Sequence, residues 1–157
     1  MAALHTLIAR LDALLDPGAF RDFTPNGLHV PPADPATREI ARVVTGVTAN
    51  EALLRAAVER DADLVLAHHG MFWRNDPLGV DGPRRRKLAL LLEHDLALAA
   101  YHLPLDAHAT HGNNALLARA IGAERIERAF PMGGTPIGVV AHLPDGGIAP
   151  QELLARV

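Results

Sequence analysis

The sequence predicts an α/β fold, with a mostly parallel sheet flanked by helices in a single domain spanning residues 1–157. Apolar, β-branched segments alternate along the chain with segments of helical periodicity, which is the order of βα units. A length of 157 residues suits one domain. A composition of 49% hydrophobic and 21% charged residues is typical of a chain with a buried core.

The first third of the chain contains one expected helix and one expected strand. Residues 2–15 place leucine and isoleucine at helical spacing, and Asp16-Pro17-Gly18 ends that helix. Residues 20–35 are expected to be irregular because prolines and Asn26-Gly27 interrupt them. Residues 39–48 alternate and carry β-branched side chains, which indicates a strand.

The remaining expected elements continue the alternation of helix and strand. In chain order they are helix 50–60, strand 64–67, helix 84–94, strand 96–101, helix 113–121 and strand 137–143. Asn50 and Asn113 are the expected N-caps of two of these helices. Residues 149–157 begin a further helix and stop without a C-cap, so we expect a fragment truncated at its C-terminus.

Composition excludes several functional classes. The chain has no cysteine, which excludes disulfides and thiolate metal sites and suits a cytoplasmic protein. Fifteen basic residues against 18 acidic ones give no strong nucleic-acid signal. The most apolar stretch, residues 88–105, is interrupted by charged and histidine residues, so no membrane span is expected. Because serine is also absent, a serine or cysteine nucleophile is excluded.

Histidine is the residue type that points to chemistry. The chain has nine histidines. Six of them fall between positions 68 and 111: His68, His69, His94, His102, His108 and His111. Histidine is the commonest metal ligand and titrates near neutral pH. The cluster therefore predicts either a metal site built from imidazole and carboxylate or an acid–base centre.

The doublet His68-His69, followed by Gly70, comes directly after the expected strand 64–67. Ligands of open α/β sheets bind beyond the carboxyl ends of the strands. Adjacent side chains on a strand point to opposite faces, so we expect the two imidazoles to serve two different metal ions. The alternative is that one imidazole packs in the core while the other bonds a loop carbonyl.

A second polar segment, His102 to His108, follows the expected strand 96–101. Pro104 predicts a loop here rather than a regular helix. Asp106 is a candidate carboxylate ligand, with His102 or His108 as a ligand, an acid–base group or a supporting partner. The alternative is a turn begun by Asp106 with solvated histidines.

Together the two segments make a stronger prediction than either alone. They end consecutive βα units, which a parallel sheet makes neighbours. Nitrogen and oxygen donors without sulfur favour zinc, manganese, iron, nickel or magnesium. Such a site would generate a hydroxide for hydrolysis.

Two further segments are weaker candidates for nucleotide binding. Arg84-Arg85-Arg86-Lys87 suits a triphosphate, although such a run is more often the solvated start of a helix. Phe72, Trp73 and Arg74 could line a base-binding pocket by stacking, although packing is the more common role of such aromatic residues. The pair Asn113-Asn114 is expected to cap a helix.

Taken in order, these motifs resemble the NIF-three-like dinuclear metal-centre proteins, also labelled GTP cyclohydrolase 1 type 2 homologues. The segments that carry the resemblance are TPNGLHV (24–30), VTGVTAN (44–50), ADLVLAHHGMFW (62–73) and YHLPLDAHATHGNNALLARAIG (101–122). The resemblance implies homo-oligomers, specifically hexamers, of α/β subunits that each bind two divalent metal ions. It also implies a small-molecule nucleotide substrate, GTP, whose guanine ring is opened by hydrolysis with release of formate.

The resemblance also implies roles for individual residues. His68 and His69 match the doublet that contributes one ligand to each metal, and Asp106 matches the carboxylate ligand. His102 matches the histidine of an HxxxD motif, which we place beside the metals as a catalytic proton carrier.

The sequence departs from the family pattern after Asp106. The family's last two ligands are a histidine and a glutamate in an HxxxE motif, and His108, His111 and His142 have no glutamate four residues on. Two-metal chemistry of the fragment alone is therefore in question. The alternative functions are a metal-dependent nucleotide phosphoesterase and a non-catalytic hexameric scaffold or regulatory protein that binds metal.

Overall fold

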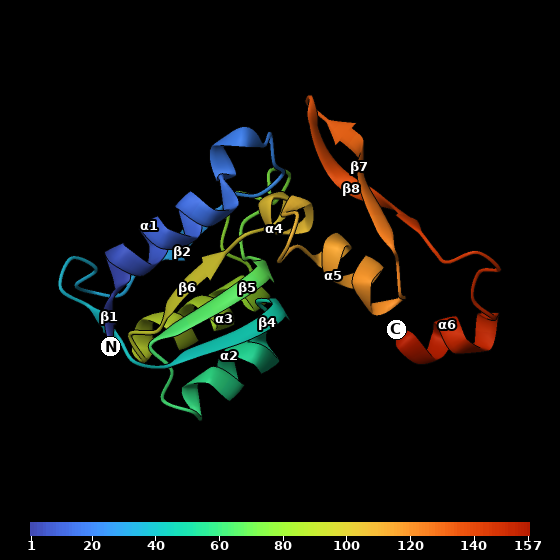
Figure 1. Cartoon of the computed structure of the whole chain (residues 1–157). Helices are drawn as coiled ribbons and strands as arrows, with labels where there is room; N and C mark the ends of the chain where they lie inside the picture. The colour runs from blue at the N-terminus through green and yellow to red at the C-terminus, as the bar shows by residue number, and fades with distance from the viewer. The chain divides into compact units, whose positions relative to one another are not determined.

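The computed structural model describes residues 1–157, which form two compact units. The first unit comprises Met1–Pro17 and Asp22–His102, and the second comprises Gly18–Arg21 and Leu103–Val157. Figure 1 follows the chain through both from blue to red. None of the helices combines the length and the apolar character that crossing a membrane requires.

A four-stranded sheet forms the centre of the first unit, in the order β2-β6-β5-β4. The strands are β2 (Gly27–Val30), β4 (Val43–Thr48), β5 (Leu64–His69) and β6 (Ala97–Ala100). Strands β4, β5 and β6 are parallel, and β2 runs antiparallel to β6 at one edge. The predicted mostly parallel sheet is therefore confirmed.

Helices cover both faces of this sheet (Figure 1). Helix α1 (Leu4–Leu15) lies on one face, and α2 (Glu51–Val58) and α3 (Gly82–Glu93) lie on the other. A short antiparallel pair, β1 (Ala2–Ala3) with β3 (Glu39–Ile40), completes the strands of this unit. A 3-10 turn, Pro17–Ala19, follows α1. This is the layered α/β arrangement that the alternation of elements predicts.

The core follows the two-residue period of the buried strands. In β5, Val65 packs with Leu54 of α2 and Leu91 of α3. Its neighbour Leu64 packs with Leu4 of α1 on the opposite face. All five of these side chains are essentially buried. Because both faces of the strand are covered, its first four residues, Leu64–Ala67, are all apolar rather than alternating.

Two helix starts show why the sequence folds as it does locally. The Asn50 side chain accepts a hydrogen bond from the N–H of Leu53 at 2.9 Å, as expected for the N-cap of α2. Asp81 caps α3 by accepting from the N–H of Arg84 at 2.8 Å. That cap makes α3 begin at Gly82, two residues before the predicted start.

The second unit contains three helices and a hairpin. Its elements are α4 (Leu103–Ala107), α5 (Asn113–Ala120), β7 (Arg125–Met132), β8 (Thr135–His142) and α6 (Pro150–Arg156). The antiparallel strands β7 and β8 are joined by Gly133-Gly134, both with positive φ. A two-residue turn of that type needs positive φ at both positions, which glycine adopts without strain.

Several element predictions differ from the structure. Residues 20–35, expected to be irregular, contain β2, an edge strand in a proline-rich segment. Residues 125–132 form β7, for which no strand was expected. Residues 102–108, expected to be a loop, contain the helix α4. Pro104 lies in its first turn, where the missing N–H has no helical partner to lose.

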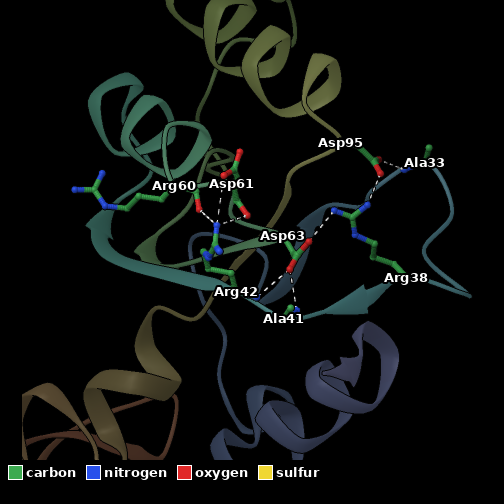
Figure 2. A network of polar contacts seen from close by, with 8 residues as sticks. All are labelled: Ala33, Arg38, Ala41, Arg42, Arg60, Asp61, Asp63 and Asp95. Carbon is green, nitrogen blue, oxygen red and sulfur yellow. Dashed lines mark hydrogen bonds and ion pairs between the residues drawn. The ribbon is translucent and has the colours of Figure 1, made fainter.

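Asp63 explains why the strand predicted over residues 39–48 divides into β3 and β4. Its Oδ2 accepts the N–H groups of Ala41 and Arg42 at 2.8 and 2.9 Å, which takes both donors out of a ladder (Figure 2). Burial alone would raise the pKa of Asp63. Hydrogen bonds from Arg42 and Ala41, together with the Arg38 guanidinium, outweigh that effect and hold the pKa below its ordinary 3.8.

Arg38 links the amino ends of two parallel strands (Figure 2). Its guanidinium bonds Asp63, which precedes β5, at 3.1 Å, and Asp95, which precedes β6, at 2.7 Å. Asp95 also accepts the N–H of Ala33 at 2.7 Å. This polar network therefore lies at the end of the sheet opposite the ends of the strands that carry the histidines.

Candidate metal centre

Three of the histidines meet at the carboxyl edge of the sheet. His68 and His69 are the last residues of β5, and His102 follows two residues after the end of β6. The register pairs Ala67 with Ala100 in parallel strands, so the residues beyond them leave the sheet at the same edge. One ligand nitrogen from each of the three lies within 4.8 Å of the others. All three side chains are partly buried.

The imidazoles of His68 and His69 lie side by side, with ring centroids 4.4 Å apart. The expectation that they point to opposite faces of the strand is therefore wrong. Alternation of side chains holds while a strand continues, and His69 is the last residue of β5. The ring of His102 lies 5.0 Å from that of His68 and 5.6 Å from that of His69.

Each of the three imidazoles is oriented through its Nδ1 atom. His68 Nδ1 bonds the carbonyl of Tyr101 at 3.1 Å, and His102 Nδ1 bonds the carboxylate of Asp22 at 2.7 Å. A carbonyl and a carboxylate only accept, so Nδ1 carries the proton and the lone pair is on Nε2. His69 Nδ1 lies 3.1 Å from the hydroxyl of Thr48. His68 and His102 therefore have the tautomer and the support that metal-ligating histidines have.

Asp22 and Asn26 fix the position of His102. The side chain of Asp22 is only 3% exposed. Its Oδ2 accepts from the Asn26 amide at 3.0 Å, and Asn26 Oδ1 in turn accepts the N–H of His102 at 2.7 Å. His102 is therefore fixed at both its ring and its backbone. Both supporting residues come from the segment expected to be irregular, where no periodicity marks them.

Asp106, the candidate carboxylate ligand, lies in the second unit on α4. Its Oδ1 accepts a hydrogen bond from the Asn113 amide at 2.9 Å, which orients the carboxylate. We expected Asn113 to be the N-cap of α5, but the N-cap is Gly112. Asn114 bonds the carbonyls of Asp106 and Ile137 instead of capping the helix.

His108 has a structural role in the second unit. Its Nδ1 accepts the N–H groups of Thr110 and His111 at 3.2 and 3.0 Å, which places its proton on Nε2. A neutral imidazole held in this way has no lone pair left for a metal. His108 is therefore the ligand candidate that the structure disfavours.

Two of the four basic side chains at the start of α3 are occupied by contacts within the protein. Arg84 pairs with Asp76 at 2.8 Å and donates to two loop carbonyls, and Arg86 pairs with Glu51 at 2.8 Å. These two guanidiniums are not held ready for a triphosphate. The geometry favours the interpretation of this run as the start of a helix.

The donor set fits a divalent metal ion. It consists of imidazole nitrogens without sulfur, and protein oxygens hold the Nδ1 atoms. The chemistry available at the edge is therefore metal binding together with proton transfer at His102.

Comparison with known proteins gives a consistent result. The family described as Duf34/NIF3 (NGG1p interacting factor 3) matches residues 2–157. A Yersinia pestis protein named "GTP cyclohydrolase 1 type 2 homolog" is 50% identical over 136 residues, covering 83% of this chain and 53% of its own length. A Pseudomonas aeruginosa protein of the same name is 49% identical over 122 residues, covering 78% of this chain and 47% of its own length.

Solved structures agree on the fold. One titled "protein ybgI, unknown function" has a TM-score of 0.75 and 39% identity, covering 80% of this chain and 49% of its own. The protein TTHA1606 from Thermus thermophilus has a TM-score of 0.73 and 37% identity, covering 80% of this chain and 50% of its own. The chain thus spans about half the length of the relatives that it matches.

Proposed function

The chain belongs to the Duf34/NIF3 family, and we propose that it acts as a metal-dependent hydrolase of the GTP cyclohydrolase 1 type 2 kind. The reaction is hydrolytic opening of the guanine ring of GTP with release of formate. The observation that carries the proposal is the cluster of His68, His69 and His102, with Nδ1 atoms held by protein oxygens. It lies where open α/β sheets bind ligands.

Two divalent ions are part of this proposal. His68 and His69 each contribute a ligand, and Asp106, oriented by Asn113, contributes a carboxylate. When bound, divalent ions supply Lewis acidity and a hydrolytic nucleophile at neutral pH. Assembly into a hexamer belongs to the same proposal.

His102 is the proton carrier in this scheme. Its Nδ1–H is held on the Asp22 carboxylate at 2.7 Å, so the basic nitrogen is Nε2. The carboxylate stabilises the imidazolium that forms when Nε2 takes a proton, and it keeps the ring in place during the transfer. C8 is bonded to both N9 and N7, so release of formate consumes two waters, and in this scheme His102 returns one proton to the departing nitrogen at each of the two cleavages.

The test begins with the metal content of the 157-residue chain purified without chelator, followed by formate release from GTP with Zn²⁺ or Mn²⁺ added. We expect bound metal and formate in the native chain, and loss of both in His68→Ala. The matched control is His5→Ala, an exposed histidine of α1 outside the cluster. Bound metal without formate would refute the hydrolase and favour the scaffold. A chain that retains no metal would refute the proposal that these 157 residues hold a metal centre by themselves.

A further inference from the structure

A pocket of about 300 Å³ adjoins the histidine cluster. Its lining includes Phe23, Thr24, Pro25, Phe72, Trp73 and Arg74. We propose that this pocket binds the planar base of a guanine nucleotide, stacked on its aromatic side chains. Small-molecule pockets begin at about this size, so its volume suits a base better than a whole nucleotide. The choice of guanine rests on the proposed function.

The pocket and the cluster share a wall. The Trp73 ring meets the His102 ring edge-on, with centroids 5.1 Å apart, and lies 5.8 Å from the His69 ring. Asp22, which holds His102, also lines the pocket. A flat ligand in this pocket therefore lies directly beside the histidine that we assign to proton transfer.

Packing does not account for all of these aromatic side chains. Phe23 is 44% exposed, and Trp73 is only partly buried and belongs to neither hydrophobic core cluster. Phe72 does pack partly against the core and stacks with His29, so it forms the base of the pocket and is not an exposed stacking surface. Exposed aromatic faces at the rim of a pocket are the platforms on which bases stack.

Arg74 supplies the polar contact that distinguishes one base from another. Its guanidinium lies over the Phe23 ring at 5.3 Å, and its Nη2 donates to the carbonyl of Asp22. A guanidinium has five N–H donors, so others are available at this exposed rim. Arginine pairs with O6 and N7 of guanine, whereas adenine presents a donor in place of O6. N7 is bonded to C8, the carbon released as formate in the proposed reaction.

The loop that carries Trp73 is held in place without a ligand. Asp76 accepts the N–H of Trp73 at 3.1 Å and pairs with Arg84 at 2.8 Å. The hydroxyl of the buried Thr24 donates to the carbonyl of Phe72 at 2.6 Å. Because these bonds order the pocket in advance, less conformational entropy is lost when a base binds.

The single tryptophan of the chain, Trp73, makes the test direct. Metal-free protein in chelator is titrated with guanosine, adenosine and inorganic tripolyphosphate while its fluorescence is recorded. We expect guanosine to quench the fluorescence at a lower concentration than adenosine, and tripolyphosphate to leave it unchanged. Quenching by tripolyphosphate alone, or by neither nucleoside, would overturn the proposal.

Two variants assign the binding to the residues named. Arg74→Ala should weaken guanosine binding by about tenfold and remove the preference over adenosine, and Phe23→Leu should weaken both nucleosides by about fivefold or more. The control is Arg10→Ala, an exposed arginine of α1, which should bind as the native chain does. Unchanged binding in Arg74→Ala and Phe23→Leu would overturn the proposal.

The same variants separate this inference from the proposed function. If guanosine binding depends on Arg74 but the protein releases no formate, the proposal of a base pocket stands and the proposal of a hydrolase is refuted. If Arg74→Ala and Phe23→Leu release formate with an unchanged KM for GTP, the proposal of a hydrolase stands and the proposal of a base pocket is refuted.

Discussion

Replacing Asp63 with asparagine should destabilise the first unit by an amount that its contacts allow us to estimate. The substitution keeps the shape of the side chain and removes its charge. In the native chain the carboxylate accepts two backbone N–H groups, at 2.8 and 2.9 Å, and pairs with Arg38 at 3.1 Å. An amide turned to accept both N–H groups must direct its own NH₂ at the guanidinium, so the pair is lost.

The magnitude follows from these three contacts. A hydrogen bond to a charged group contributes about 1.5–3 kcal/mol against about 0.5–1.5 kcal/mol for a neutral one, so the two N–H bonds lose about 2 kcal/mol together. The ion pair adds less than about 1 kcal/mol because both side chains are partly exposed. Relief of the buried charge offsets part of the loss. We expect a net loss of about 2 kcal/mol in the free energy of unfolding at pH 7.

The assay is urea unfolding followed by far-ultraviolet circular dichroism. The matched control is Asp61→Asn, because Asp61 is 94% exposed and its positive φ of 48° suits asparagine. We expect that control to change stability by less than about 0.5 kcal/mol. An Asp63→Asn protein as stable as the Asp61→Asn protein at pH 7 would refute the reasoning.

The pH dependence gives a second check on Asp63. Its pKa is lower in the folded chain than the ordinary 3.8, so the unfolded chain binds the proton first as pH falls. The stabilisation is therefore complete above pH 3.8 and is lost as pH falls through the folded pKa. The difference in the free energy of unfolding between the native and Asp63→Asn chains should be constant from pH 7 to 5 and should become smaller below pH 3.8. A difference that narrows at higher pH would implicate another group.

Three further predictions follow from contacts at the other end of the sheet. Gly70→Ala should lower the free energy of unfolding, measured in urea, by about 1–3 kcal/mol, because a Cβ at this position would lie 2.1 Å from the His29 ring. The control Gly79→Ala should leave that free energy unchanged, because a Cβ there would meet open space. His29 donates to Pro25 and accepts from Met71, and burial lowers its pKa below 6.5. Stability should therefore fall as pH drops from 6.5 towards that pKa, and His29→Gln should reduce the fall. Asp22→Asn should lower formate release from GTP about 10- to 100-fold at unchanged metal content, since it removes the charged partner of His102. Unchanged turnover in that variant would exclude the assigned role.

Local patterns predicted the elements whose residues are placed by periodicity. The apolar part of β5, Leu64–Ala67, and the whole of β6 are short apolar runs because helices cover both faces, and that composition is visible without a structure. The Asn50 cap was equally visible. Strand β2 was not predicted, because Gly27–Val30 is a strand only through its antiparallel pairing with β6. That pairing joins residues some 70 positions apart, and no local signal encodes it.

The candidate site likewise has a part that the sequence predicts and a part that it does not. The approach of His102 to His68 and His69 follows from strand ends and a parallel register, both of which the sequence indicates. The supporting partners do not follow from any pattern. Asp22 and Asn26 hold His102 from an irregular segment, and nothing in their spacing marks them as partners of a residue about 80 positions away.

The two ends of the parallel strands therefore have separate roles. Asp63 precedes β5 and belongs to a network that stabilises the fold, whereas His69 ends the same strand and belongs to the candidate metal centre. Six residues of strand place them about 20 Å apart. Substitutions that far apart act independently on stability. Loss of metal binding in an Asp63 variant would thus indicate unfolding of the sheet, whereas the same loss in a His69 variant that unfolds normally would indicate the site itself.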